Sequence, residues 1–194
     1  MADAIRGWFL TLYALGVLAI LVRVLPLGLR RASIERRAEG RERWLPRLMI
    51  PFNFGVPLLA LWLRLGELRL EWRPLRLVGV LLSGYAAVML LSASATLGRF
   101  LRPEAVVLAD HELVTRGPYR LVRHPIYSAN LALWLGAALG TLNGLLLATW
   151  PVLLAGNRLE VAIEERLLAA RFGEVWERYA ARTGRLLPRL WGGR

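Results

Sequence analysis

Residues 75–97 read LRLVGVLLSGYAAVMLLSASATL, an apolar run in which Arg76 is the only charged residue. A helix needs about 20 predominantly apolar residues to cross the hydrocarbon core of a membrane. This run has that length, and its single charge lies near one end. It therefore predicts a membrane-spanning helix, and other parts of the chain repeat the pattern.

Four further apolar stretches have similar character, at roughly 7–29, 48–65, 126–142 and 145–159. Arg23 lies near the end of the first of them, where a long arginine side chain can reach the headgroup layer. Pro51 and Pro57 interrupt the second of these and predict a kink or an irregular start. The sequence Gly-Thr-Leu-Asn-Gly at 140–144 is typical of a turn, so the last two stretches should form a tight helical hairpin that need not span fully. The sequence predicts an all-α integral-membrane bundle of about five transmembrane helices, in a single domain over 1–194. The first stretch is too long for a signal peptide, and Arg30 and Arg31 follow it rather than precede it, so we expect it to remain as a span.

Composition supports the same class of protein. Of the 194 residues 56% are hydrophobic, the mean hydropathy is +0.44 and the formal net charge is +12. High charge together with high hydropathy means that apolar spans alternate with basic loops, which excludes a disordered chain and disfavours a nucleic-acid partner. The chain has no Cys and two His, which excludes disulfides, a cysteine nucleophile and a three-histidine zinc site, so we expect no metal.

The basic residues, all of them arginine, are distributed unevenly between the two sets of loops. Residues 30–47 carry seven, residues 98–123 carry five and residues 157–194 carry eight, against five in the N-terminal segment and the 64–76 link. Cytoplasmic loops of membrane proteins are enriched in Arg and Lys. The asymmetry predicts an N terminus outside and both motif-bearing regions in the cytoplasm. Arginine-rich loops also bind anionic headgroups, so membrane lipids are expected partners.

The first region that can carry chemistry contains residues 111–119, HELVTRGPY, and residues 123–127, RHPIY. Pro125 suits the first position of a helix, which places His124 at the cap and Tyr127 in the first turn. Free backbone N–H groups at such a helix start favour a carboxylate or phosphate. The alternative is structural: His124 caps the helix and Tyr127 belongs to the aromatic belt.

The second region is residues 160–179, for which the spacing predicts one helix. At about 100° per residue, Val161, Leu168, Phe172, Val175 and Tyr179 share a narrow apolar stripe. Glu164 and Glu165 lie beside this stripe, whereas Glu174 and Glu177 lie away from it. A carboxylate near a membrane core is usually functional, and it would bind a ligand amine, a ligand hydroxyl or an arginine. The alternative is a structural ion pair with one of the many arginines.

The chain contains neither a dinucleotide-binding G-x-G-x-x-G motif nor a P-loop, so a nucleotide-like cofactor has to be bound by helix ends and loops. A single G-x-x-x-G occurs at 136–140. It indicates close packing between helices.

Together these residues resemble the isoprenylcysteine carboxyl methyltransferase family of integral-membrane methyltransferases. The family's H-x-L-V-T-x-G-x-Y run, its R-H-P-x-Y block and its Glu-Glu pair before Phe-Gly are matched by 111–119, 123–127 and Glu164-Glu165 before Phe172-Gly173. The resemblance covers roughly 78–188, which we expect to be the cofactor-binding and catalytic core. A similar R-H-P-x-Y stretch occurs in phospholipid N-methyltransferases and membrane sterol reductases.

The resemblance implies S-adenosylmethionine as the cofactor and a lipidic or prenylated molecule as the methyl acceptor. It assigns cofactor binding to ten residues: His111, Glu112, Leu113, Val114, Tyr119, His124, Pro125, Ile126, Tyr127 and Glu164. The family's substrate-carboxylate arginine stands four residues before the first Glu, where this chain has Glu160. Two solutions remain open: Arg158 replaces that arginine, or the acceptor is an amine, thiol or hydroxyl whose proton Glu160 or Glu165 accepts. Arg158 and Glu165 are therefore the candidate catalytic residues.

Three functions compete at this point. A lipid-directed methyltransferase, either like the isoprenylcysteine enzymes or like the phospholipid N-methyltransferases, accounts for all the motifs. A membrane reductase using NADPH shares part of them but requires more helices and a second phosphate site. The third alternative is a non-enzymatic membrane protein that keeps the fold.

Overall fold

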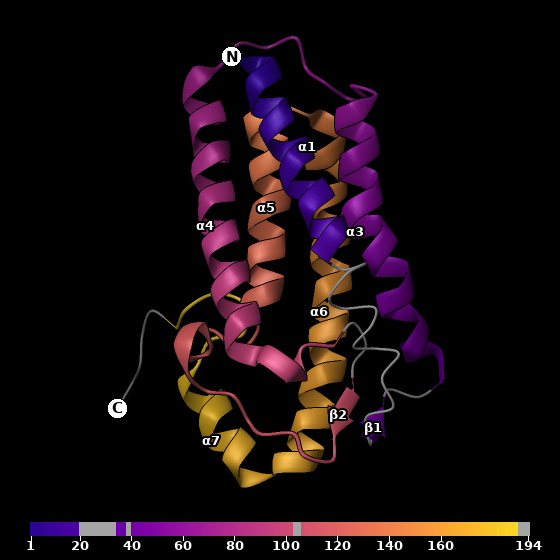
Figure 1. Cartoon of the computed structure of the whole chain (residues 1–194), viewed down its shortest axis with the longest axis vertical. Helices are drawn as coiled ribbons and strands as arrows, with labels where there is room; N and C mark the ends of the chain where they lie inside the picture. Colours follow the sequence, from indigo (N-terminus) through magenta and orange to yellow (C-terminus); the bar gives the residue numbers. More distant parts are fainter. Residues whose placement is uncertain (20–33, 38–39, 103–105, 190–194) are drawn as a thin grey trace.

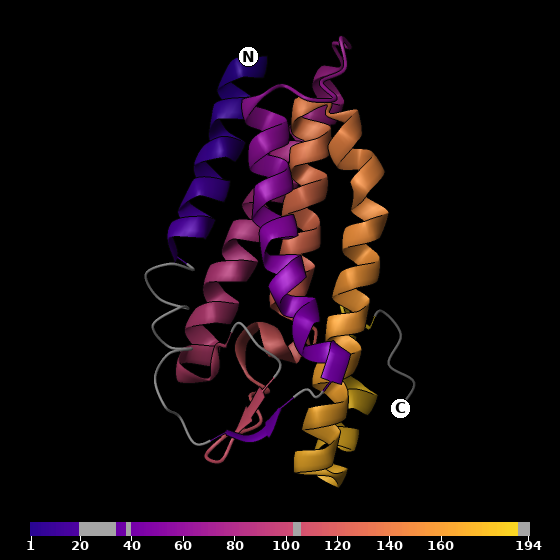
Figure 2. The ribbon, with the colours of Figure 1, turned by 90° about the vertical axis from the view of Figure 1, so that its right-hand side faces the viewer.

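The computed structural model describes residues 1–19, 34–37, 40–102 and 106–189. In these residues the long helices run alongside one another as a bundle (Figures 1 and 2). They are α1 (Ala2–Ala19), α3 (Leu45–Trp62), α4 (Arg73–Leu97), α5 (Pro125–Thr141) and α6 (Gly144–Phe172). The shorter elements are β1 (Ile34–Arg37), β2 (Val106–Leu108), η2 (Gly40–Trp44), η3 (Gly98–Phe100), η4 (Gly117–Arg120) and α7 (Glu174–Arg182). β1 and β2 pair antiparallel, and with α7 they lie at the end of the bundle remote from the N terminus.

The outer surface of the bundle is apolar, as a lipid-facing surface must be. On α4 the exposed large side chains recur at helical spacing, at Leu77, Leu81, Val88 and Leu91. Within the described residues α1, α3, α4 and α6 are long and apolar enough to cross a membrane. α5 has 17 residues, or about 25 Å, and lies inside the bundle. The all-α integral-membrane bundle is thus confirmed, with four helices that meet the length of a span and a shorter, enclosed fifth.

The observed bounds of α3, α4 and α5 agree with the apolar stretches of the sequence to within a few residues. α4 and α5 match the stretches expected at 75–97 and 126–142 to within two residues. α3 continues as helix through Pro51 and Pro57, so an irregular start is not observed. Residues 20–29 of the first stretch, with Arg23, lie outside the described residues, as do Arg30 and Arg31.

The expected boundary between a short fifth span and a separate helix at 160–179 is wrong. α6 is one helix of 29 residues from Gly144 to Phe172, with Pro151 inside it. The chain then turns at Gly173, whose φ of +50° favours glycine, and α7 begins at Glu174. The apolar spacing continues numerically across this break, which is why periodicity alone did not locate it. In consequence Val175 is exposed, and Trp176 is the buried residue of α7.

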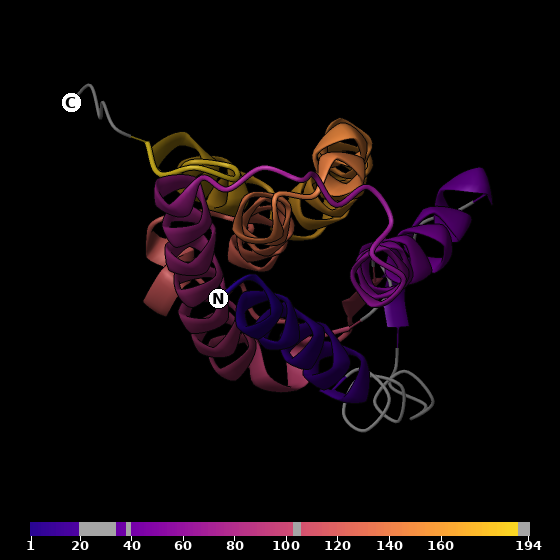
Figure 3. The same ribbon diagram turned by 90° about the horizontal axis from the view of Figure 1, so that it is seen from above.

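α4 and α5 pack closely because three glycines meet between them. A side chain at Gly79 would lie 2.2 Å from the backbone nitrogen of Gly140 and 2.5 Å from the backbone oxygen of Gly136. The G-x-x-x-G at 136–140 therefore serves contact between helices of the same chain, as the sequence indicated. This close approach lets the remaining helices surround α5, which lies between α4 and α6 in the view along the bundle (Figure 3).

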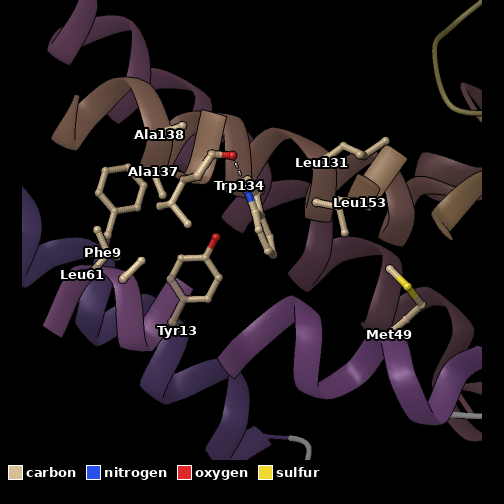
Figure 4. Close-up of a cluster of buried hydrophobic side chains, with 11 residues drawn as sticks. Phe9, Tyr13, Met49, Leu61, Leu131, Trp134, Ala137, Ala138 and Leu153 are labelled. Atoms are coloured by element: carbon tan, nitrogen blue, oxygen red, sulfur yellow. Dashed lines mark hydrogen bonds between the residues drawn. The ribbon is translucent and has the colours of Figure 1, made fainter. Parts of the chain in front are cut away.

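The core around α5 is assembled from side chains of four helices (Figure 4). Trp134 is fully buried, stacks on Phe52 with ring centroids 5.1 Å apart, and donates its indole N–H to the carbonyl of Leu146 at 2.9 Å. Phe9 and Tyr13 bring α1 onto the same cluster. Inside a membrane, helices are held together by close van der Waals packing and interhelical hydrogen bonds, and this cluster packs α1 and α3 against the α5–α6 hairpin.

The hairpin turn expected at 140–144 is confirmed. Asn143 caps α6 by accepting a hydrogen bond from the backbone N–H of Leu146 at 3.0 Å. Its side-chain amide also donates to the carbonyl of Leu65 at 2.9 Å, which ties the turn to the link between α3 and α4. This end of the bundle lies beside the N terminus, so the arginine-rich segments gather at the opposite end (Figure 1).

We expect the arginine-rich end of the bundle to face the cytoplasm, because basic loops are retained there. The absence of native cysteine permits a labelling test with Arg69→Cys and Thr115→Cys, two exposed positions at opposite ends. An impermeant thiol reagent applied to intact cells should label Arg69→Cys and leave Thr115→Cys unlabelled until the membrane is permeabilised. The reverse pattern would invert the orientation.

Candidate functional site

The site begins at the start of α5, at the arginine-rich end. α5 starts at Pro125 and His124 is its N-cap residue, as the sequence predicted. The imidazole makes no capping bond, however, and turns toward α6 instead. Its Nδ1 lies 3.4 Å from Glu164 Oε2 and its Nε2 lies 3.2 Å from Glu165 Oε1. A buried imidazole thus bridges the two adjacent carboxylates of α6.

Glu164 also accepts a hydrogen bond from Tyr127, whose hydroxyl lies 2.5 Å from Oε1. Its side chain keeps 30% of its surface exposed, so the carboxylate faces open space as well as its two partners. α6 explains this position: about 20 residues cross the hydrocarbon core, and the first 20 from Gly144 reach Ile163. Counted in this way, Glu164 is the first residue of α6 beyond the length that a membrane span needs.

Glu165 is occupied by a different set of partners. Arg123 donates from Nε to Glu165 Oε1 at 2.9 Å, and Arg185 donates to Glu165 Oε2. The same Arg123 donates to the carbonyl oxygens of Ala180, at 2.8 Å, and Thr183. Charge-assisted bonds of this kind are the stronger ones in proteins, so Glu165 anchors the loop before α5 to the chain beyond α7.

The chain beyond α7 runs alongside the loop that carries His124. The backbone N–H of Arg123 donates to the carbonyl of Gly184 at 2.8 Å, and that of His124 donates to the carbonyl of Arg185 at 3.1 Å. Gly184 has no room for a side chain, because a Cβ there would lie 1.8 Å from the carbonyl oxygen of Leu187. We call residues 183–189 the C-terminal strap; it holds His124 against α6.

His111 occupies the other wall of the site. Its ring stacks on Phe100 with centroids 4.7 Å apart and meets the edge of Phe172 at 6.0 Å. Burial lowers the pKa of His111, which keeps the imidazole neutral at neutral pH. Its Nδ1 is buried and has no hydrogen-bond partner among the described residues. A buried polar atom without a partner is costly unless a ligand or water satisfies it.

These walls enclose a cavity of about 170 Å³. Small-molecule sites usually measure about 300–1,000 Å³, so the cavity accommodates part of such a ligand in this conformation. Its lining residues are Leu97, Phe100, Leu101, Arg102, Val106, His111, Tyr119, Arg123, His124, Pro125, Ile126, Tyr127, Glu164, Leu167 and Leu168. One side is apolar and aromatic, and the other carries Glu164 and His124.

The structure brings together seven of the ten residues to which the sequence assigned cofactor binding: His111, Tyr119, His124, Pro125, Ile126, Tyr127 and Glu164. Glu112, Leu113 and Val114 do not line the cavity, and Glu112 is exposed. Neither candidate catalytic residue lines it. Glu165 is engaged as described above, and Arg158 is exposed on α6 with no hydrogen bond or ion pair in the described part of the chain.

Sequence reasoning missed the wall formed by the end of α4. Leu97 and Phe100 reach the cavity because α4 stops at Gly98, which has a φ of +55°, and the next residues form the short η3 helix. The available signal was a glycine just beyond a span with an aromatic residue two positions later.

Comparison with known proteins places this site in a family. The model of the phospholipid methyltransferase family matches residues 75–175, more than half of the 194-residue chain. The chain belongs to the phospholipid methyltransferase family. That family is part of the isoprenylcysteine carboxyl methyltransferase-like group of membrane methyltransferases, so the resemblance read from the sequence is confirmed. The matched residues 75–175 include every residue that lines the cavity.

A curated relative is the cobalt-zinc-cadmium resistance protein CzcN of Cupriavidus metallidurans, 43% identical over 84 residues. The match covers 42% of this chain and 38% of the relative, so it spans less than half of either protein. The name of this relative concerns metal resistance. Within the described residues no group of three or more His, Cys, Asp or Glu side chains is placed to hold a metal ion.

The charge of His124 should make stability depend on pH. Burial opposes the charged imidazole, but the hydrogen bonds that it donates to Glu164 and Glu165 outweigh burial and raise the pKa of His124 above its usual value. A raised folded-state pKa contributes stability that is complete below about pH 6.5 and is lost as the pH rises through the higher value. The melting temperature of wild type should therefore exceed that of His124→Gln most at pH 6, and the difference should shrink toward pH 9. A difference that does not vary with pH would show that folding leaves the pKa of His124 unchanged, and a difference that grows toward pH 9 would show that the folded imidazole stays neutral.

Proposed function

We propose that this member of the phospholipid methyltransferase family transfers a methyl group from S-adenosylmethionine to a lipidic acceptor at the cytoplasmic face of the membrane. The observation that carries the proposal is the placement of Glu164. Its carboxylate is held between His124 and Tyr127, on the wall of the cavity and at the membrane boundary. A water-soluble cofactor and a lipid tail can reach this point from opposite sides.

The residues present fit the cofactor. Glu164 offers acceptor oxygens to the ribose hydroxyls or the amine, and the unpartnered Nδ1 of His111 offers a further hydrogen bond. Phe100 and Tyr119 provide aromatic surface for the purine, and Tyr119 or Tyr127 provides a ring face for a sulfonium. Glu112, Leu113 and Val114 remain proposed cofactor contacts, reached from the loop that leads out of β2.

When bound, S-adenosylmethionine supplies an activated methyl group on a good leaving group. The work left for the protein is to align the acceptor with that methyl group and to exclude water. Tyr127 and His124 fix the Glu164 carboxylate in one orientation, and the apolar wall of Leu97, Leu101 and Leu168 keeps water from the reacting atoms. Glu165 acts in this proposal as a positioning residue, because Arg123, Arg185 and His124 already engage its carboxylate.

The role of Arg158 depends on the acceptor. Its exposed side chain lies about four turns along α6 from Gly144, from where it can extend toward the headgroup layer. In that position it would pair with a lipid phosphate or with a carboxylate acceptor that approaches from the bilayer. It remains a proposed acceptor contact on these grounds.

Calorimetric titration of the purified protein in detergent tests the proposal. We expect S-adenosylhomocysteine to bind with one site and NADPH not to bind. Binding of NADPH would favour the reductase, and the absence of binding by either ligand would favour a non-enzymatic membrane protein.

A further inference from the structure

Two neighbouring segments at the end of the bundle remote from the N terminus contain seven arginines and no acidic residue. They are residues 116–124, which lead from η4 to the start of α5, and residues 178–189, which comprise the end of α7 and the C-terminal strap (Figure 1). Val122 and Gly184 pair in a parallel bridge, and hydrogen bonds join the segments on both sides of it. The fold therefore brings like charges together at this place.

Three of these arginines have no partner within the described part of the chain. The other four are satisfied there, by Glu165 for Arg123 and Arg185, by Glu174 for Arg178, and by the carbonyl of Ala181 for Arg189. Arg116, Arg120 and Arg182 are exposed and form no hydrogen bond or ion pair with the described residues. Guanidinium groups are the side chains best suited to bind phosphate, because their planar set of donors matches its oxygens.

Arg120 and Arg182 are the two that the bridge places on adjoining segments. Each stands two residues before a member of the Val122–Gly184 pair. Two like charges in the same neighbourhood repel each other, and a bound anion removes that repulsion. The arrangement thus favours a ligand that carries negative charge.

Two large apolar side chains are exposed beside these arginines. Leu121 directly follows Arg120 and is 56% exposed, and Leu187 of the C-terminal strap is 79% exposed. The strap folds back on itself here, since the carbonyl oxygen of Leu187 occupies the space in which Gly184 would carry a side chain. Elements that lie in the interface of a membrane combine basic residues with exposed leucines in the same way.

The position of the two segments along the bundle agrees with such an interface. His124 ends the first segment and contacts Glu164 and Glu165. About 20 residues cross the hydrocarbon core, and these two glutamates are the first residues of α6 beyond that length. By this count the segments lie beside the end of the α6 span, at the depth of phospholipid head groups.

We propose that Arg120 and Arg182, together with Leu121 and Leu187, form a binding surface for an anionic phospholipid. The two guanidinium groups bind the phosphate, and the two leucines enter the acyl layer beside it. A zwitterionic phospholipid binds less well, because its own cationic group neutralises the phosphate. The inference is independent of the proposed methyl transfer, since it concerns neither the cofactor nor the methyl acceptor.

Membrane topology alone accounts for the number of arginines but not for their arrangement. Basic residues retain a loop in the cytoplasm wherever they stand near the end of a span. That role requires neither unpaired arginines on two adjoining segments nor exposed leucines next to them. The combination of both is what indicates a lipid.

Native mass spectrometry of the whole protein in detergent tests the charged part of the surface. Phosphatidylglycerol or phosphatidylcholine with the same acyl chains is titrated onto wild type and onto the double variant Arg120→Gln with Arg182→Gln. The control is the double variant Arg99→Gln with Arg178→Gln. It removes the same charge from the same end of the molecule, but from exposed arginines that already pair with Asp110 and Glu174.

We expect wild type to bind its first phosphatidylglycerol at least tenfold more tightly than phosphatidylcholine. Removing Arg120 and Arg182 should weaken this binding about fivefold for each arginine, from the usual contribution of a basic residue near an anionic lipid. The control should change it less than twofold. Melting in detergent without lipid should be the same in all three proteins, because the two arginines have no partner to lose.

Three results of this experiment would overturn the proposal. Equal affinity of wild type for the two phospholipids would remove the preference for an anionic lipid. Equal losses in the two double variants would show a diffuse attraction to a basic surface. Equal affinity for phosphatidylglycerol and for soluble glycerol 1-phosphate would identify a free phosphate as the ligand.

A fluorescence measurement tests the apolar part and does not depend on the arginine variants. The chain has no native cysteine, so Leu187→Cys can be labelled with a fluorophore and the protein reconstituted in vesicles with brominated acyl chains. The label should be quenched by these chains. Val175→Cys is the control, because Val175 is 51% exposed on α7 and is not part of the proposed surface. Equal quenching at both positions, or none at Leu187→Cys, would show that the strap does not enter the bilayer and would overturn the proposal.

Discussion

Replacing Glu164 by glutamine should weaken the binding of S-adenosylhomocysteine about ten- to a hundredfold. The substitution keeps the shape of the side chain and removes the charge that binds the ligand. Hydrogen bonds to charged groups contribute about 1.5–3 kcal/mol, and each 1.4 kcal/mol is a factor of about ten in affinity. Titration calorimetry in detergent, with wild type measured beside the variant, gives the ratio of dissociation constants.

Glu174→Gln is the matched control for this prediction. Glu174 lies on α7, its side chain is 86% exposed, and its ion pair with Arg178 is a surface contact. We expect its affinity for the ligand to equal that of wild type. Equal affinity in both variants would remove Glu164 from the cofactor site. A loss in both would indicate a general effect of negative charge at this end of the molecule.

Tyr127→Phe separates direct binding from the orientation of the carboxylate. The variant retains the ring but loses the hydroxyl that donates to Glu164. The lost hydrogen bond affects the ligand only through the orientation of the carboxylate, so the loss of affinity should be smaller than for Glu164→Gln, which removes the charge itself. The order of the two effects follows from the geometry, because the tyrosine acts through the carboxylate.

The spans were predictable because they depend on local composition. The run at 75–97 predicts a helix from apolarity and length alone, and the structure has α4 at 73–97. The start of α5 was predictable for a similar reason, since Pro125 restricts both its own backbone and that of His124. In both places a feature of a few neighbouring residues decides the outcome.

The direction of the His124 side chain was not predictable from such features. A helix start with free N–H groups predicts that a nearby imidazole caps it, whereas the ring binds carboxylates that lie 40 and 41 residues later in the chain. That choice depends on the packing of α5 against α6, which no local pattern encodes. The same holds for Glu165, which was predicted beside a buried face but whose partners Arg123 and Arg185 come from two separate loops.

The contacts of the C-terminal strap could not be predicted from the sequence, for a third reason. Its contacts with the loop before α5 are made by backbone groups of Gly184 and Arg185, so they leave no side-chain pattern in the sequence. Gly184 is the one residue whose identity reflects these contacts, because there is no space for a side chain at its position. Glycine occurs near the end of a chain for many reasons, and the sequence alone does not distinguish among them.

Replacing Arg123 by leucine should lower the free energy of unfolding by about 3 kcal/mol. Removing one partner of a buried ion pair costs about 3–5 kcal/mol because the remaining charge is left without compensation. The side chains of Arg123 and Glu165 are each only 12% exposed, so solvent screens the pair little. Arg185 and His124 still contact Glu165 in the variant, and this places the loss at the lower end of the range.

The loss should be concentrated in the C-terminal strap and α7. Without Arg123 the carbonyl groups of Ala180 and Thr183 lose their donor, and the strap keeps only its backbone contacts. Thermal unfolding in detergent gives the overall stability, and amide hydrogen exchange over 174–189 locates the change. Arg178→Leu is the control, since its pair with Glu174 is an exposed i,i+4 contact worth about 0.3–0.5 kcal/mol. Similar melting of the two variants would show that Arg123 does not support the fold.

A double substitution then distinguishes charge from packing. If the uncompensated Glu165 carboxylate causes the loss, Arg123→Leu combined with Glu165→Leu should be more stable than Arg123→Leu alone, because buried ion pairs are often replaced by apolar pairs without loss. Cofactor affinity should not recover with stability, since His124 loses one of the two carboxylates that orient it. Recovery of both together would mean that Glu165 is dispensable for the site and that the strap alone holds His124 in place.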